Sequence, residues 1–149
     1  MTVVEVQTVA KAVNLPTQSQ IEQWINTALQ NYPEDSEIVV RIVDETESAE
    51  LNKQYRNKAG ATNILSFPAD LPDELGINLL GDLVVCAPVL AKEALEQQKN
   101  LEDHWAHILI HGVLHLLGYD HLNDNDASIM ENKEIELLQQ LQISNPYLY

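Results

Sequence analysis

Residues 111–121 read HGVLHLLGYDH and contain three of the five histidines in the chain. At about 100° per residue, His111 and His115 lie about 40° apart on one helix face and about 6 Å apart along its axis. Two imidazoles placed in this way can bind one metal ion. Gly118 can adopt the left-handed conformation that ends a helix, which would turn the chain and bring His121 to the same ion. The spacing therefore predicts a metal site with two ligands on a helix and a third after a glycine turn.

The same spacing, H-x3-H-x2-G-x2-H, occurs in the metzincin metalloproteases, with one difference. Their first histidine is followed by a glutamate that serves as general base, and here that position is Gly112. The missing base argues against ordinary peptide hydrolysis. It leaves three imidazoles, which resemble a catalytic zinc site with an open fourth position. The alternative is that the three histidines are unrelated residues of a core helix and its loop.

The composition is that of an ordinary globular protein. The chain has 149 residues, 45% of them hydrophobic, which suffices for one domain with a buried core. No apolar run approaches the roughly 20 residues of a membrane span, and the sequence does not open with a basic-then-apolar signal pattern. Cys86 is the one cysteine and lies in an apolar run, so we expect a core residue rather than a disulfide partner or metal ligand. These features favour a cytoplasmic location.

The net charge of −15 is unusual for a protein that binds nucleic acid, because such binding draws on Lys and Arg. The chain has eight Lys and Arg residues, and three of them (Lys53, Arg56 and Lys58) lie within six residues. This cluster is either an ordinary solvated face or a local positive field beside the predicted metal ion. The overall charge therefore does not exclude a substrate that carries phosphate.

Elsewhere the sequence alternates strands with helices. Apolar alternation and β-branched runs predict strands at residues 3–8, 37–43, 62–67 and 79–87, with a loop at 68–78. Helical periodicity and capping residues predict helices at 17–31, 46–56, 88–99, 101–117 and 124–141. Tyr55 is expected to be buried, and Gly81 indicates a bulge or a close backbone contact.

Four strands and about five helices predict a single domain over residues 1–149. Its class is α+β, a zincin-like α/β arrangement, with the metal site on a helix and the turn that follows it. The pattern does not reveal the order of the strands in the sheet.

The motifs together resemble the YbeY family, bacterial metal-dependent endoribonucleases of rRNA maturation. HGVLHLLGYDH is similar to the family signature H-G-x-L-H-L-x-G-Y-D-H. The run from Leu51 to Lys58, with Tyr55-Arg56, and TNILSFP at 62–68 resemble L-N-x-x-Y-R-x-K and T-D-V-L-S-F-P. GDLVVC at 81–86 is similar to G-D-I-x-I, and the matches span roughly residues 38–131. Asn63 stands where the family usually has aspartate, so we assign no charge-dependent role to that position.

The resemblance implies a zinc-dependent endoribonuclease specific for single-stranded RNA. It would act in rRNA maturation, including 3′-end processing of small-subunit rRNA, and in ribosome quality control. The implied ligands of one Zn²⁺ ion are His111, His115 and His121, and Arg56 joins them as a catalytic residue. The guanidinium of Arg56 offers a fork of donors that matches two phosphate oxygens. The expected partners are ribosomal RNA and the ribosome or its proteins, with no membrane or DNA.

Several features of the mechanism stay open in the sequence. Imidazoles also suit nickel, copper and iron. With Gly112 in place of glutamate, no side-chain general base can be named, and either water or an RNA 2′-hydroxyl could be the nucleophile. Asp120 either orients a ligand histidine or caps the turn.

The other polar residues point less directly to function. A triad of His107 with the first two ligands would span about 12 Å, too far for bonds near 2.0 Å to one ion, so His107 flanks the site or makes a core hydrogen bond. His104 is expected at the surface and Asp82 to be structural. Ser66 lacks the glycines of a nucleophile elbow.

Two other functions are compatible with the sequence. One is a zinc-dependent hydrolase of peptide or amide bonds, against which Gly112 argues. The other is a non-catalytic ribosome-assembly factor in which zinc only stiffens the fold. The low basic content favours the second, because weak affinity for RNA would require a protein or ribosomal partner to deliver it.

Overall fold

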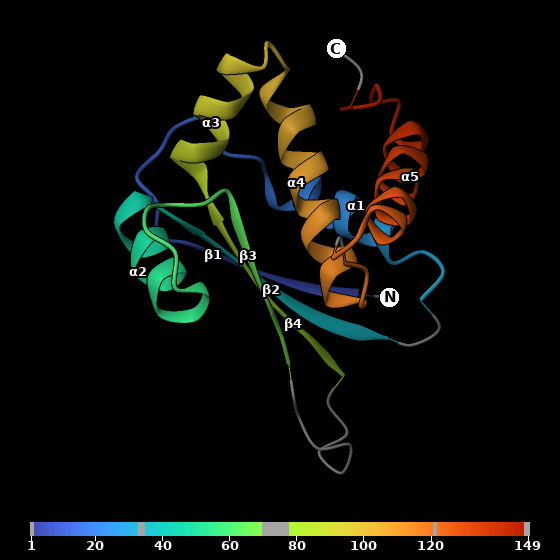
Figure 1. Cartoon of the computed structure of the whole chain (residues 1–149), viewed down its shortest axis with the longest axis horizontal. Coiled ribbons are helices and arrows are strands. Elements are labelled where there is room, and N and C mark those ends of the chain that lie inside the picture. The colour runs from blue at the N-terminus through green and yellow to red at the C-terminus, as the bar shows by residue number, and fades with distance from the viewer. Residues whose placement is uncertain (1, 33–34, 70–77, 121, 148–149) are drawn as a thin grey trace.

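Four strands form one sheet in the computed structural model, which describes residues 2–32, 35–69, 78–120 and 122–147. The strands are β1 (Thr2–Thr8), β2 (Ser36–Val43), β3 (Ile64–Pro68) and β4 (Leu79–Cys86). The helices of the described residues are α1 (Gln18–Ala28), α2 (Glu45–Arg56), α3 (Ala87–Glu96), α4 (Leu101–Leu116) and α5 (Asp124–Gln140) (Figure 1). The predicted α+β class, with four strands and five helices, is confirmed for this part of the chain.

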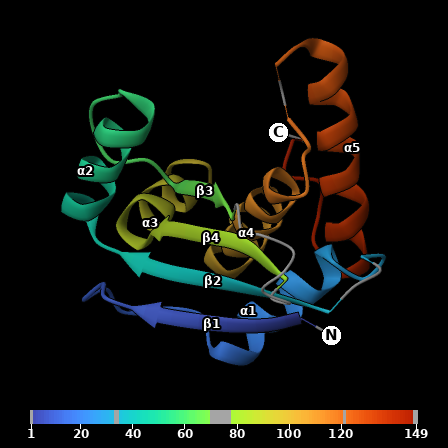
Figure 2. The same ribbon diagram turned by 90° about the horizontal axis from the view of Figure 1, so that it is seen from below.

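The strand order is β1-β2-β4-β3, which the sequence pattern did not reveal (Figure 2). β1, β2 and β4 run parallel, and β3 pairs antiparallel with β4. Pro68 lies opposite Gly81 at the end of β3. Proline cannot donate a ladder hydrogen bond, so an edge strand is where a sheet tolerates it. This order places β3 against α4, the helix that carries His111 and His115.

α4 lies at the centre of the larger of two hydrophobic cores. It packs on one face of the sheet beside α1, and it also contacts α3 and α5. Its apolar side chains are buried over most of its length, among them Trp105, Ile108, Leu109, Ile110, Val113 and Leu114. On β4, Val84 and Cys86 alternate with Leu83 and Val85 and therefore belong to the smaller core on the opposite face, under α2. Cys86 is buried, as predicted for a core residue.

The predicted glycine stop after α4 is confirmed. Gly118 has a φ of +101°, and its N–H donates to the carbonyl of His115 at 3.0 Å. The N–H of Tyr119 donates to the carbonyl of Leu114, also at 3.0 Å. These two bonds form a Schellman motif, which satisfies the last carbonyls of the helix and reverses the chain.

The predicted irregularity at Gly81 is confirmed as both a bulge and a close contact. Gly81 has a φ of +150°, and the register between β2 and β4 shifts at Glu37/Ile38. A Cβ atom on Gly81 would lie 2.3 Å from the carbonyl oxygen of Phe67 and 2.9 Å from Leu116 Cδ2. Glycine is therefore required here, where the backbones of β3 and β4 approach beneath the end of α4.

Two predicted exposures were wrong. His104 lies inside the protein with 3% of its surface exposed, because α3 packs over it and Glu93 accepts its hydrogen bond. Tyr55 is 59% exposed, because the last turn of α2 extends beyond the smaller core. The Tyr55 ring makes an edge contact with the Phe67 ring, and the two ring centroids lie 5.1 Å apart. The first predicted helix also ends earlier, at Ala28.

The remaining predictions about the fold concern the loop and the membrane. Most of the predicted loop at 68–78 lies outside the described residues. Within the described part of the chain, no helix is long and apolar enough to cross a membrane.

Candidate functional site

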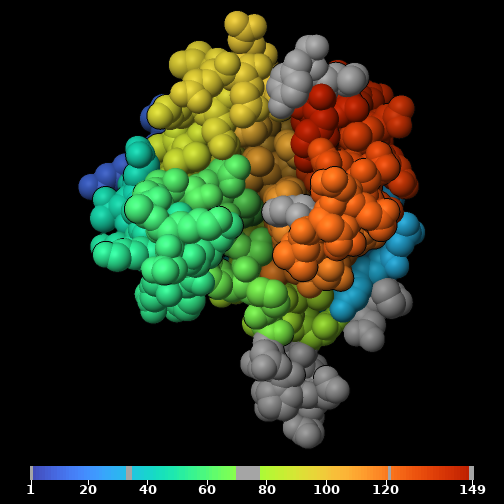
Figure 3. All heavy atoms as spheres, viewed as in Figure 1, coloured from blue at the N-terminus to red at the C-terminus, as the bar shows by residue number. Residues whose placement is uncertain are grey.

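A cleft of about 650 Å³ opens between the end of α2, strand β3 and the second half of α4. The polar residues that line it are Arg56, Asn63, Ser66, His111, His115 and Asp120. Figure 3 shows the hollow between the green atoms of α2 and β3 and the orange atoms that follow α4. The cleft therefore brings together residues from three of the stretches that carry the resemblance, 51–58, 62–68 and 111–120.

His111 and His115 face each other in this cleft. Their Nε2 atoms lie 3.1 Å apart, and the ring planes cross at 82°. Two nitrogens bound tetrahedrally to zinc at 2.0–2.1 Å would lie roughly 3.3 Å apart. The observed pair fits two ligands of one ion without a change of helix geometry, as the i, i+4 spacing predicts.

The third predicted ligand, His121, lies outside the described residues. Among the described residues, no three His, Cys, Asp or Glu side chains gather into a group that could hold a metal ion. The structure thus describes two of the three predicted ligands and the glycine turn that leads toward the third.

Gly112 has a packing reason for being glycine. A Cβ atom there would lie 2.6 Å from Ile64 Cδ1 and 3.0 Å from Leu83 Cδ2, so α4 packs directly on β3 and β4 at this point. The Ser66 hydroxyl donates to the Gly112 carbonyl at 3.3 Å. A glutamate in this position would have to displace the buried ends of the Ile64 and Leu83 side chains, so the metzincin type of general base does not fit the core as it is packed here.

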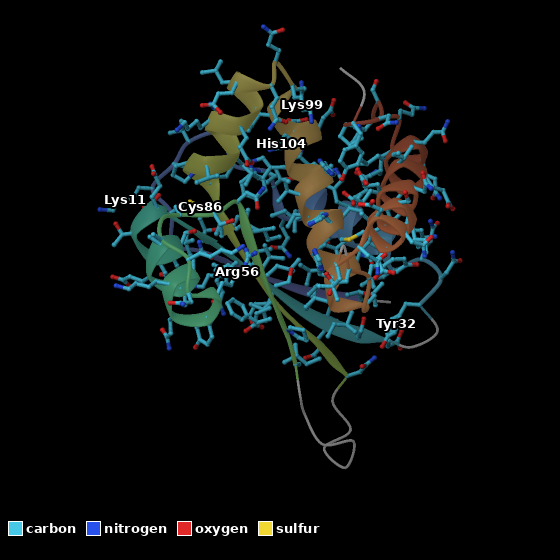
Figure 4. The ribbon with its side chains drawn as sticks, viewed as in Figure 1. Lys11, Tyr32, Arg56, Cys86, Lys99 and His104 are labelled. Atoms are coloured by element: carbon cyan, nitrogen blue, oxygen red, sulfur yellow. The ribbon has the colours of Figure 1, made fainter. Side chains whose placement is uncertain are left out.

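Among the described residues that line the cleft, Arg56 is the one lysine or arginine. It is the last residue of α2 and is exposed, and in Figure 4 it lies between the ribbons of α2 and α4. Asn57 follows in the left-handed conformation, with a φ of +55°, and ends the helix. Lys53 and Lys58 of the same basic cluster are exposed and do not line the cleft. Only Arg56 is thus placed to meet a ligand beside the histidines.

Glu134 of α5 is a site residue that sequence reasoning missed. Its carboxylate is completely buried, and Oε2 lies 3.3 Å from His111 Nδ1. Oε1 lies 2.6 Å from His107 Nε2 and accepts from the Tyr147 hydroxyl at 2.9 Å. The predicted core hydrogen bond of His107 is therefore confirmed. A signal existed in the sequence, because Glu134 falls four residues after Met130 on the buried stripe of α5.

The electrostatics of Glu134 follow from these contacts. Burial raises the pKa of a carboxyl group, but hydrogen bonds from His107 and His111 outweigh it and bring the pKa of Glu134 to about 2. Burial lowers the pKa of His107, and the bond to Glu134 opposes this effect without overcoming it. Glu134 is therefore an anion in the folded protein at neutral pH.

Asn63 has a partner that explains the departure from aspartate. Its Nδ2 lies 3.3 and 3.4 Å from the two carboxylate oxygens of Glu93, and its Oδ1 accepts from the N–H of Ile64. Glu93 Oε1 also lies 2.9 Å from His104 Nε2. An aspartate at position 63 would bring a second carboxylate against Glu93, which the amide avoids.

Asp120 lines the cleft from the turn after α4 and is exposed. Its two predicted roles, orienting a ligand histidine and capping the turn, stay predictions. Asp82 is exposed on β4 and does not line the cleft.

Residues 5–142 match the family model described as endoribonuclease YbeY. The endoribonuclease YbeY of Colwellia psychrerythraea is 48% identical over 150 residues, covering 98% of this chain and 97% of the relative. The solution structure of TM1509 from Thermotoga maritima is similar in fold, with a TM-score of 0.66 and 26% identity. That similarity covers 93% of this chain and 88% of the other.

Proposed function

The chain belongs to the endoribonuclease YbeY family, and on that premise we propose that it is a zinc-dependent enzyme that cleaves phosphodiester bonds of single-stranded RNA. The proposed ligands of one zinc ion are His111, His115 and His121. The observation that carries the proposal is that Arg56 and the facing imidazoles of His111 and His115 line one cleft.

Each residue of the cleft has a distinct task in this proposal. Bound zinc would supply a Lewis acid for a phosphoryl oxygen. Arg56 donates to the non-bridging oxygens of the same phosphate, holds it against the histidine pair and offsets charge that develops during cleavage. Gly112 provides no base, and the attacking group is either a water or the 2′-hydroxyl of the RNA itself. The Ser66 hydroxyl is bonded to the Gly112 carbonyl and ties β3 to the ligand helix.

The proposed biological setting is rRNA maturation in the cytoplasm, with small-subunit rRNA 3′-end processing and ribosome quality control as its tasks. A net charge of −15 gives little general attraction for RNA. A ribosomal protein or the ribosome itself would therefore deliver the substrate and raise its local concentration.

The test pairs zinc content with cleavage of a single-stranded rRNA fragment. Wild type should carry about one zinc and cut. His115→Ala should lose the zinc, whereas Arg56→Ala should keep it and cut about 10²–10³-fold more slowly, the loss typical for one transition-state donor. Lys53→Ala removes the same charge from the same helix outside the cleft and should cut normally.

Three outcomes would contradict the proposal. Loss of zinc in Arg56→Ala would indicate a structural role for that residue. A wild type that binds zinc but cuts no RNA, even with ribosomal substrate, would support the non-catalytic assembly factor. Cleavage of peptides rather than RNA would support the alternative function, a zinc-dependent hydrolase of peptide or amide bonds.

A further inference from the structure

The proposed ligand His111 is held from behind by a buried carboxylate on another helix. From these contacts we propose that Glu134 is a positioning residue for the metal site, orienting the His111 imidazole so that Nε2 faces the cleft. We propose also that His107 and Tyr147 orient Glu134 in turn. The inference rests on the proposed function, because it concerns a ligand of the proposed zinc ion.

The hydrogen bond determines which nitrogen of His111 can bind a metal. A carboxylate accepts hydrogen bonds and cannot donate them, so the 3.3 Å contact to Oε2 requires the proton of His111 to be on Nδ1. In the neutral imidazole Nε2 is then unprotonated, and this is the nitrogen that lies 3.1 Å from His115 Nε2. The lone pair of His111 is thus directed at the place where the proposed ion would sit.

Glu134 is itself fixed by its surroundings. Its side chain is completely buried on the stripe of α5 that also buries Met130, Leu137 and Leu138. The second oxygen accepts from His107 Nε2 and from the Tyr147 hydroxyl. A buried carboxylate is costly unless several donors satisfy it, and here one of those donors belongs to the proposed metal ligand.

This arrangement also assigns a role to His107. It lies one turn before His111 on α4, and its Nε2 meets Glu134 rather than the cleft. The imidazole therefore holds the carboxylate in place and does not bind metal. Tyr147 does the same from the C-terminal tail, where its backbone N–H is bonded to Asn145 Oδ1.

The test measures zinc affinity by competition with a chromophoric chelator, using the full-length folded protein. Glu134→Gln keeps the shape but weakens the acceptor, and should bind zinc about 10–100-fold less tightly, the usual cost of losing such a partner. Tyr147→Phe removes one donor to Glu134 without touching His111 and should give a smaller loss. Glu136→Gln, the same charge change at an exposed position of α5, should bind zinc like wild type.

A second readout does not depend on metal. In the zinc-free wild type, nitrogen NMR should show His111 as the Nδ1–H tautomer, and Glu134→Gln should populate the other tautomer. Unchanged zinc affinity in a folded Glu134→Gln protein would overturn the proposal, as would an Nε2–H tautomer of His111 in wild type. If Glu134→Gln does not fold, Tyr147→Phe and the wild-type tautomer decide the question. Failure of wild type to bind zinc would refute the proposed function instead.

Discussion

Replacing Gly81 with alanine would test whether a close contact between β3 and β4 supports the end of α4, the helix that carries His111 and His115. The added Cβ would lie 2.3 Å from the carbonyl oxygen of Phe67, whereas ordinary van der Waals contact begins at 3.4 Å. The neighbour is backbone and cannot move away by changing its rotamer. The two strands would have to separate by about 1 Å where Gly81 pairs with Pro68.

Two costs add at this position. A side chain at a φ of +150° is strained by about 1–3 kcal/mol. Forcing an extra methyl group into a packed region costs a further 1–3 kcal/mol, roughly. We expect Gly81→Ala to lose about 4 kcal/mol of the free energy of unfolding, which is a large part of the roughly 5–15 kcal/mol typical of a domain. For a chain of this size the melting temperature should fall by roughly 8–16 °C.

The assay is urea and thermal unfolding of the zinc-free protein, with Gly60→Ala as the matched control. Gly60 also has a positive φ, +89°, but a Cβ there would meet nothing within 4 Å. The Gly60→Ala variant should therefore be destabilised only by backbone strain, which costs about 1 kcal/mol. If Gly81→Ala were no less stable than Gly60→Ala, the close approach would not exist and the reasoning would fail.

The contact also reaches the site. The same Cβ would lie 2.9 Å from Leu116 Cδ2, and Leu116 directly follows the proposed ligand His115. Zinc affinity should accordingly fall in Gly81→Ala and stay unchanged in Gly60→Ala. If the two variants bound zinc equally well, the contact at Gly81 would stabilise the sheet but would not place the proposed ligand His115.

Three further predictions concern charge. Asn63→Asp should destabilise the protein by about 1 kcal/mol in urea unfolding, through repulsion with Glu93; an aspartate variant as stable as wild type would contradict this. The hydrogen bond from Arg41 lowers the pKa of Glu47 below its usual 4.5. The pair therefore stabilises the fold above pH 4.5, and this stabilisation is lost as the pH falls through the lowered pKa that Glu47 has in the folded protein. Between pH 6 and pH 3, the free energy of unfolding should therefore fall less in Glu47→Gln than in wild type, by up to about 1 kcal/mol. Arg56→Ala should reduce the slope of log affinity for single-stranded RNA against log salt by about 0.7, the loss of one phosphate contact.

The local features of the site could be predicted because local geometry determines them. The i, i+4 spacing alone places His111 and His115 on one helix face, and the structure brings their Nε2 atoms together. Gly118 and Gly81 were recognisable because each occupies a backbone conformation that other residues avoid. None of these three predictions needed knowledge of which elements pack together.

Features that depend on packing between distant elements could not be predicted. The strand order decides that β3, and not another strand, forms one wall of the cleft, and the periodicity does not contain this order. His104 is buried because α3 covers it, whereas Tyr55 is exposed because the last turn of α2 extends beyond the smaller core. Glu134 reaches His111 from a helix 23 residues further along the chain.

Gly112 shows why ligand spacing and reaction type are separate properties of such a helix. The spacing of the histidines places the two proposed ligands, since only the face of α4 toward the cleft is involved. The residue between them lies on the face that meets Ile64 and Leu83, whose buried side-chain ends occupy the space that a side chain at position 112 would need. A metalloprotease base would need these side chains to be displaced or smaller, and so a differently packed core. In this protein the group that takes up the proton must come from the substrate, from solvent or from another wall of the cleft, which is why the same spacing can serve phosphodiester rather than peptide chemistry.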